Sequence, residues 1–162
     1  MSMTARRLLR GACALTMAAW AGFVCATPSP MPPVFDAALL PPVTAGMEGN
    51  PYRHHPDRAV IVQVGRSVYN QSCAVCHGAD ANRLGPAPAL RIVGRFCQRI
   101  ADVSLRSRCQ GDADHYFYKS VMEGKVKLGV THMPAWREAL TPEALWAVRT
   151  FLEAPAPADA RP

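Results

Sequence analysis

The sequence has little that would support nucleic-acid binding or catalysis by side chains alone. It contains no lysine-rich tail, and no nucleophile–base pair or carboxylate cluster is evident. The formal net charge is +6, but the 18 basic residues fall to 15 without Arg6, Arg7 and Arg10, against 12 acidic residues, which leaves +3. Because a mildly basic chain lacks the charge density that phosphate backbones attract, we expect no nucleic-acid partner.

The N-terminal apolar stretch is too short for an ordinary membrane span. It begins at Gly11 and ends at Ala26, whereas a spanning helix needs about 20 residues. Three arginines precede it, and Val24 and Ala26 place small residues at the −3 and −1 positions of a cleavage site. The pattern predicts an export signal over residues 1–26 and a periplasmic protein. The alternative is an uncleaved anchor facing the periplasm.

The remaining chain is long enough for one domain, flanked by two irregular segments. Residues 27–56 hold eight of the 15 prolines and predict an extended N-terminal arm. This arm is either a loose tether or is pinned to the domain surface by Phe35, Leu39 and Leu40. Residues 154–162 predict a disordered C-terminal tail. The predicted folded domain therefore covers residues 57–153.

The apolar spacing within that domain is helical. Helices are predicted at Asp57–Tyr69, at Asp112–Glu123 and at Thr141–Leu152. In the last of these, Thr141 is a favourable N-cap and Pro142 occupies the first helical position. Since no pattern of alternating strands and helices is present, the fold class we predict is a small all-α domain.

The segment QSCAVCHGAD at 71–80 carries the strongest chemical signal. On a helix, Cys73 and Cys76 project from one face, and His77 follows one turn after Cys73. Two thiols can then bond the two vinyl groups of a haem while the imidazole reaches its iron. A four-cysteine zinc site would need a second closely spaced pair, and a thioredoxin-like dithiol would need a βαβ context. In an exported chain the motif predicts one covalently bound haem c.

A second axial ligand is predicted in the segment VTHMPAW at 130–136. The thioether of Met133 is a soft, neutral ligand that suits haem iron. Pro134 would fix the backbone after it, and Trp136 would shield the haem edge. A lone methionine is usually core packing, but a Met-Pro dipeptide between two predicted helices favours a ligand. His132 is the rival, and bis-histidine ligation would lower the reduction potential.

With CAVCH at 73–77, Gly85-Pro86 and Met133-Pro134 in this order, the domain resembles a class I c-type cytochrome. The resemblance implies four to five helices wrapped around one haem. It also implies that a glycine and an aromatic residue mark a close crossing of the first and last helices, which maps onto Gly65 and Trp146. Pro86 is the matching position for the proline whose carbonyl group orients the imidazole of His77.

The segment between Leu90 and the middle helix is longer than a minimal member of that family would need. Five arginines and one aspartate give residues 91–108 a local charge of +4, and on a helix Arg91, Arg95 and Arg99 would align. They would form a docking face, neutralise a haem propionate or face solvent. Cys97 and Cys109 are either a disulfide or two reduced, buried thiols.

With both axial positions filled, no coordination site is left for a substrate. We therefore expect a monohaem carrier of single electrons, not an enzyme, whose partners are redox proteins and which is a monomer or a subunit of a complex. One alternative is an electron-accepting subunit of a periplasmic dehydrogenase, with residues 27–56 as its docking strap. The other is a haem enzyme or ligand-binding protein with a displaceable sixth ligand.

Overall fold

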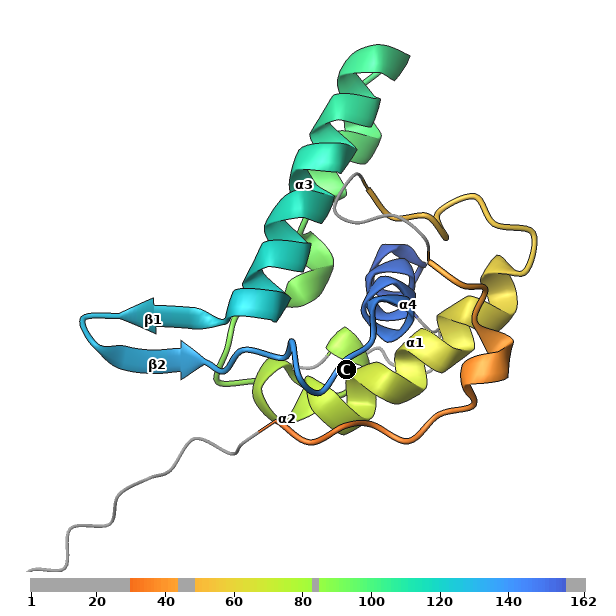
Figure 1. Cartoon of the computed structure of the whole chain (residues 1–162). Coiled ribbons are helices and arrows are strands. Elements are labelled where there is room, and N and C mark those ends of the chain that lie inside the picture. Colours follow the sequence, from red (N-terminus) through yellow and green to blue (C-terminus); the bar gives the residue numbers. More distant parts are fainter. Residues whose placement is uncertain (1–29, 44–48, 83–84, 157–162) are drawn as a thin grey trace, which may run out of the picture.

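The computed structural model describes residues 30–43, 49–82 and 85–156 (Figure 1). The predicted export signal lies outside these residues. Within them, no helix is both long and apolar enough to cross a membrane.

The described chain is mostly helical, as predicted. Its α-helices are α1 (Arg58–Ser72), α2 (Ala74–His77), α3 (Val103–Glu123) and α4 (Pro142–Glu153). Short 3₁₀ helices are η1 (Ala37–Leu39), η2 (Ala79–Ala81), η3 (Leu90–Ile92) and η4 (Arg95–Arg99). Between α3 and α4 the strands β1 (Lys125–Lys127) and β2 (Val130–Met133) form an antiparallel hairpin.

Helices α1 and α4 cross closely, and Gly65 is what permits the approach. A Cβ atom at Gly65 would lie 2.0 Å from the carbonyl oxygen of Ala147 and 3.1 Å from the Cβ of Phe151. The predicted crossing is present, although the closest contact falls on Ala147, one residue after Trp146. One helical turn further along α1, the rings of Tyr69 and Phe151 pack with their centroids 5.4 Å apart.

The predicted N-terminal arm is part of the folded unit wherever the structure describes it. Leu40 and Tyr52 are buried in the same core as α1 and α4, and the Tyr52 hydroxyl donates to the carbonyl oxygen of Pro41. The backbone of Val34 is bonded through both its N–H and its C=O to the side chain of Gln71 in α1. The prediction that the domain begins at Asp57 is therefore wrong, because residues before it supply core side chains.

The arginine-rich segment does not form the helix that would align its cations. Gly94, with φ of 76°, separates η3 from η4. Helix α3 begins at Val103, nine residues earlier than predicted. The side chain of Asp102 accepts a hydrogen bond from the backbone N–H of Leu105 and caps that earlier start. The half-buried side chain of Arg91 donates hydrogen bonds to the carbonyl oxygens of Phe151 and Ala154, at the end of α4.

The hairpin is a feature that the sequence pattern does not predict. Its two-residue turn places Leu128 and Gly129 at φ of 51° and 76°. Turns of this kind normally carry Asn-Gly or Gly-Gly. Because this turn carries Leu128-Gly129, the sequence does not show the usual hairpin pattern. Met133 consequently lies at the end of β2 and not in an irregular loop.

Candidate functional site

Cys73, Cys76 and His77 lie together on the single turn of α2. Cys73 both ends α1 and begins α2, since its N–H donates to Tyr69 O at 2.8 Å and its own carbonyl accepts from His77 N at 2.9 Å. Neither Cys73 nor Cys76 is in a disulfide. The one-turn spacing read from the sequence is therefore the spacing in the fold, with two thiols and an imidazole on one short helix.

The orientation of the His77 ring follows from a single contact. Its Nδ1 lies 2.7 Å from the carbonyl oxygen of Pro88. A carbonyl oxygen only accepts hydrogen bonds, so Nδ1 carries the proton and Nε2 of the neutral imidazole keeps its lone pair for a metal. The prediction that Pro86 supplies this carbonyl is wrong by two residues.

The shift from Pro86 to Pro88 has a local cause. Gly85 packs so tightly on the haem-motif turn that a Cβ there would lie 2.2 Å from the carbonyl oxygen of Cys76. Ala87 N–H donates to that same oxygen at 2.9 Å. The segment therefore lies against Cys76 through Ala87, and the next residue, Pro88, is the one whose carbonyl reaches the imidazole.

Tyr69 fixes the backbone behind His77. Its hydroxyl lies 2.9 Å from the carbonyl oxygen of Gly78 and 3.2 Å from that of His77. Burial raises the pKa of Tyr69, so the phenol stays protonated and remains a donor. No pattern in the sequence indicated these bonds.

A polar clamp joins α1 to η2 just after the motif. Arg66 holds both carboxylate oxygens of Asp80 at 2.8 Å, and Asn70 both donates to that carboxylate and accepts from the Asp80 N–H. The Arg66 and Asn70 hydrogen bonds lower the pKa of Asp80 to about 2. Asp80 itself sits at φ of 56°. No pattern in the sequence indicated this clamp.

Met133 is held by backbone contacts with the end of α3. A Cβ at Gly124 would lie 2.5 Å from the carbonyl oxygen of Met133, and Trp136 N–H donates to Val121 O at 2.9 Å. The side chains of Met133 and Trp136 are half-buried and pack against the core. His132, the rival ligand, is exposed.

The donor set fits a haem better than a zinc ion. In residues 30–43, 49–82 and 85–156 no three His, Cys, Asp or Glu side chains are placed to share a metal. Burial raises the pKa of the Cys73 thiol to about 12. Two unpaired thiols, an imidazole with Nε2 available and a thioether match covalent attachment with His and Met ligation.

Similarity to known proteins agrees with this chemistry. Residues 61–152 match the family described as cytochrome c oxidase, cbb3-type, subunit III. The chain is also 31% identical over 153 residues to cytochrome c550 of Pseudomonas aeruginosa, covering 93% of this chain and 96% of that protein. The chain belongs to the class I c-type cytochromes. This cytochrome therefore carries covalently bound haem c and takes part in electron transfer with redox proteins. No solved structure gave a significant match.

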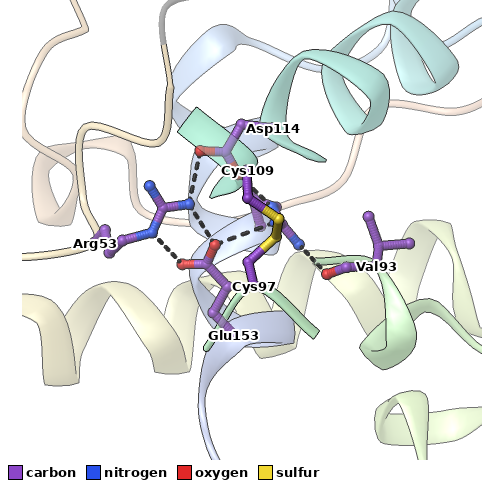
Figure 2. Close-up of a disulfide and its surroundings, with 7 residues drawn as sticks. Arg53, Val93, Cys97, Cys109, Asp114 and Glu153 are labelled. Atoms are coloured by element: carbon purple, nitrogen blue, oxygen red, sulfur yellow. Dashed lines mark hydrogen bonds and ion pairs between the residues drawn. A yellow bond between two sulfur atoms is a disulfide. The ribbon is translucent and has the colours of Figure 1, made fainter. Parts of the chain in front are cut away.

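Away from the haem motif, the cytochrome has a polar network beside a cysteine pair (Figure 2). The sulfur atoms of Cys97 and Cys109 lie 2.11 Å apart, at disulfide distance. Next to them, buried Asp114 accepts from Arg149 at 2.8 Å and from Arg53 at 2.6 Å. Arg53 also bonds Glu153.

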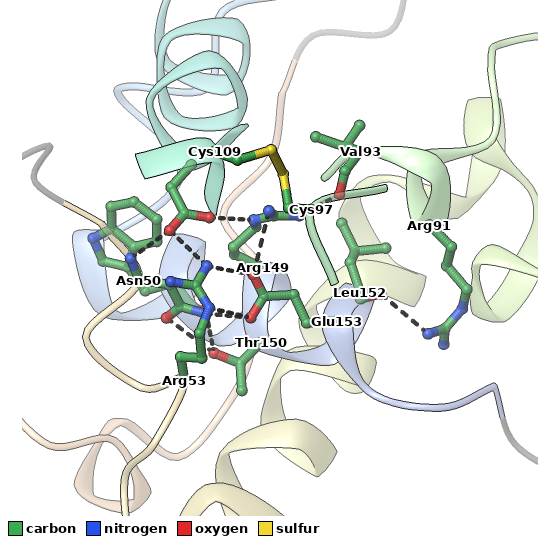
Figure 3. A network of polar contacts seen from close by, with 12 residues as sticks. Asn50, Arg53, Arg91, Val93, Cys97, Cys109, Arg149, Thr150, Leu152 and Glu153 are labelled. Carbon is green, nitrogen blue, oxygen red and sulfur yellow. Dashed lines mark hydrogen bonds and ion pairs between the residues drawn. A yellow bond between two sulfur atoms is a disulfide. The ribbon is translucent and has the colours of Figure 1, made fainter. Parts of the chain in front are cut away.

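This network ties the N-terminal segment to α3 and α4 (Figure 3). The Asn50 amide donates to the hydroxyl of Thr150 at 3.0 Å, and Arg149 donates to the carbonyl oxygen of Val93 at 3.0 Å. The Arg91 guanidinium group donates a hydrogen bond to the carbonyl oxygen of Ala154, directly after α4. Of the alternatives considered for the arginines of residues 91–108, a docking face would have to form without Arg91, while Arg95 and Arg99 are exposed.

Proposed function

We propose that the protein is a monohaem carrier that passes single electrons between redox partners in the periplasm. The observation that carries this proposal is the ligand pair. The Nδ1–H bond to Pro88 leaves Nε2 of His77 available, and half-buried Met133 is held against the core by its contacts with Gly124 and α3. With both residues on the iron, no position remains for a substrate.

The chain's own residues then have distinct parts. Cys73 and Cys76 would hold the haem covalently through thioether bonds, and His77 and Met133 would bind its iron. Haem c supplies an iron that changes between the ferric and ferrous states. Because the Pro88 carbonyl group, the Tyr69 hydroxyl and the Gly124 contact hold the ligands in one arrangement, little rearrangement accompanies the change of charge.

We further propose that the protein is exported and is not an enzyme. The pattern of residues 1–26 supports export, and periplasmic haem attachment and disulfide formation between Cys97 and Cys109 would follow from it. The structure offers no support for residues 27–56 as a strap that binds a dehydrogenase. Val34, Leu40 and Tyr52 in the described part of that segment are engaged with the cytochrome itself.

Carbon monoxide binding tests the carrier proposal against a ligand-binding or catalytic haem. Reduced wild-type protein should show no change in its visible spectrum under carbon monoxide, since Met133 occupies the sixth position. The Met133→Ala variant should bind carbon monoxide and provides the positive control. Rapid, stoichiometric binding to the wild type would contradict the carrier proposal and favour a haem with a displaceable ligand.

A further inference from the structure

A small pocket lies where the arginine-rich segment meets the end of α4. Its volume is about 190 Å³, and a water molecule takes up only about 30 Å³ in the liquid, so the pocket has room for a group of several heavy atoms. Three arginines, one glutamate and two glutamines are among the residues that line it. They are Arg91, Arg95, Arg149, Glu153, Gln98 and Gln110. The charged side chains of this set have a net charge of +2.

Three of these side chains carry donors that the described part of the chain does not engage. Within residues 30–43, 49–82 and 85–156, no side-chain hydrogen bond or ion pair is found for Arg95, Gln98 or Gln110. Arg95 and Gln98 are exposed, and Gln110 is half-buried. One guanidinium group and two amide groups can therefore donate N–H hydrogen bonds to a ligand in the pocket, and such a ligand would bring acceptor oxygens.

The cysteine pair brings the two glutamines to the same pocket. Gln98 follows Cys97 in η4. Gln110 follows Cys109 in α3, twelve positions further along the chain. Because the two cysteines lie at disulfide distance, with their Cα atoms 5.6 Å apart, the side chains next to them line one pocket. The segment that a minimal member of the family would not need thus builds one wall of this pocket.

Arg91 removes an obstacle to anion binding at the end of α4. The last carbonyl groups of a helix carry a partial negative charge that repels anions. Here Arg91 donates to the carbonyl oxygens of Phe151, Leu152 and Ala154. Its remaining hydrogen bond in the described chain goes to the carbonyl oxygen of Asp80. These partners are neutral carbonyl groups, so the charge of Arg91 is not offset by a bonded carboxylate.

The carboxylate that lines the pocket is already paired. Glu153 lies 2.6 Å from Arg53 and 3.2 Å from Arg149, and the buried Asp114 carboxylate is bonded to the same two arginines (Figure 3). Two cations therefore balance two anions in this network. The positive charge in excess at the pocket belongs to the other two arginines that line it.

We propose that this pocket binds a phosphate-type oxyanion, either as a free ion or as the phosphate group of a lipid headgroup. A guanidinium fork matches a pair of phosphate oxygens, and charge-assisted hydrogen bonds of this kind are strong. A tetrahedral oxyanion also presents acceptors in several directions, which suits donors that come from both η4 and α3. A cation would meet the excess positive charge, and an apolar group would leave the donors without partners. The inference is independent of the proposed carrier function.

The test is calorimetric titration of the haem-loaded protein with sodium phosphate near neutral pH, with sodium chloride of equal ionic strength as the reference. We expect one saturable site with a dissociation constant on the order of 1 mM. Arg95→Gln should weaken binding about tenfold or more, since it removes the exposed guanidinium group. Gln110→Ala should weaken binding about two- to tenfold through the loss of a neutral donor.

Arg99→Gln is the matched control. Arg99 is exposed in the same 3₁₀ helix as Arg95 but is not among the described residues that line the pocket. Its substitution should change the dissociation constant by less than about twofold, because it removes the same charge without a direct contact. All three variants should keep the absorption spectrum and the unfolding midpoint of the wild type, which shows that weaker binding does not come from a damaged fold.

Vesicle sedimentation distinguishes the two sources of the phosphate group. Arg95-dependent binding to phosphatidylglycerol vesicles would assign the ligand to a lipid headgroup. Phosphate binding without any vesicle binding would assign it to a free ion. Equal weakening by Arg95→Gln and Arg99→Gln, or equal heats with chloride and phosphate, would overturn the inference by showing general attraction of anions to a basic surface. Absence of both saturable phosphate binding and Arg95-dependent vesicle binding would also overturn it, and would leave the carrier function standing.

Discussion

The Nδ1 atom of His77 lies 2.7 Å from the carbonyl oxygen of Pro88. This bond sets the tautomer of the imidazole and increases the electron density at Nε2, which would stabilise ferric over ferrous iron with His77 as the proposed ligand. The carbonyl is in turn positioned by Ala87 N–H on Cys76 O. The orientation of the His77 ring, the proposed proximal ligand, is thus determined by residues 85–88 and the haem-motif turn.

Loosening this loop should raise the reduction potential. Pro88→Ala keeps a carbonyl group but makes the backbone more flexible, so the hydrogen bond to His77 weakens. The ferric state is then less stabilised relative to the ferrous state. We expect an increase of tens of millivolts, on the scale of the about 59 mV that a tenfold change in a one-electron equilibrium represents. Pro86→Ala is the matched control. Equal shifts in both variants in a redox titration would show that Pro88 has no special part.

Removing the Tyr69 hydroxyl should destabilise the fold without removing the aromatic packing. Tyr69→Phe keeps the contact with Phe151 but leaves the carbonyl oxygen of Gly78 without its donor. The free energy of unfolding in a denaturant titration should fall by about 1–3 kcal/mol. Tyr118→Phe should change it by less than about 0.5 kcal/mol, because no hydrogen bond of that hydroxyl is found in the described chain. Similar losses in both variants would argue against the role of Tyr69.

A methyl group at the helix crossing should be costly. In Gly65→Ala the new Cβ would lie 2.0 Å from Ala147 O, so α1 and α4 must move apart. We expect a loss of about 2–3 kcal/mol or more in unfolding free energy. Gly111→Ala, inside α3 with no atom within 4 Å of the new Cβ, should instead stabilise by up to about 1 kcal/mol. A tolerated Gly65→Ala would mean that the helices do not approach this closely.

The cysteine pair should contribute to stability as a disulfide. Replacing both Cys97 and Cys109 by Ser should lower the free energy of unfolding by about 3 kcal/mol, since their loop spans 12 positions in sequence. Reductant should destabilise the wild type and leave the double variant unaffected. In the denatured haem-loaded protein, alkylation and peptide mass spectrometry should find no free thiol at Cys97 or Cys109. Alkylation mapped to both of these residues would establish that they are reduced.

The parts of the fold that the sequence predicts are those with strong local signals. The first and last helices end within three residues of their predicted bounds, because apolar spacing and the Thr141-Pro142 start are local features. The earlier start of α3 was missed although Asp102 is a good N-cap, since Arg91, Arg95 and Arg99 before it suggested a helix of their own.

Long-range contacts explain the remaining differences. That Tyr52 lies in the core follows from packing against distant helices, which proline content does not reveal. The carbonyl group that contacts His77 comes from Pro88 and not from Pro86 because of the way the loop packs against Cys76. The number of residues from His77 does not determine this packing. The turn at Leu128 was not predicted because leucine is unfavourable at the positive φ that this position adopts.

The ferric absorption spectrum of the haem-loaded protein tests the central assignment most directly. With Met133 on the iron, the wild type should be low-spin and show the weak far-red charge-transfer band of methionine ligation. The band should disappear in Met133→Ala and persist in His132→Ala. A high-spin wild-type spectrum would contradict the account by showing an open site. A low-spin spectrum without the band that becomes high-spin in His132→Ala would assign the ligand to His132 instead.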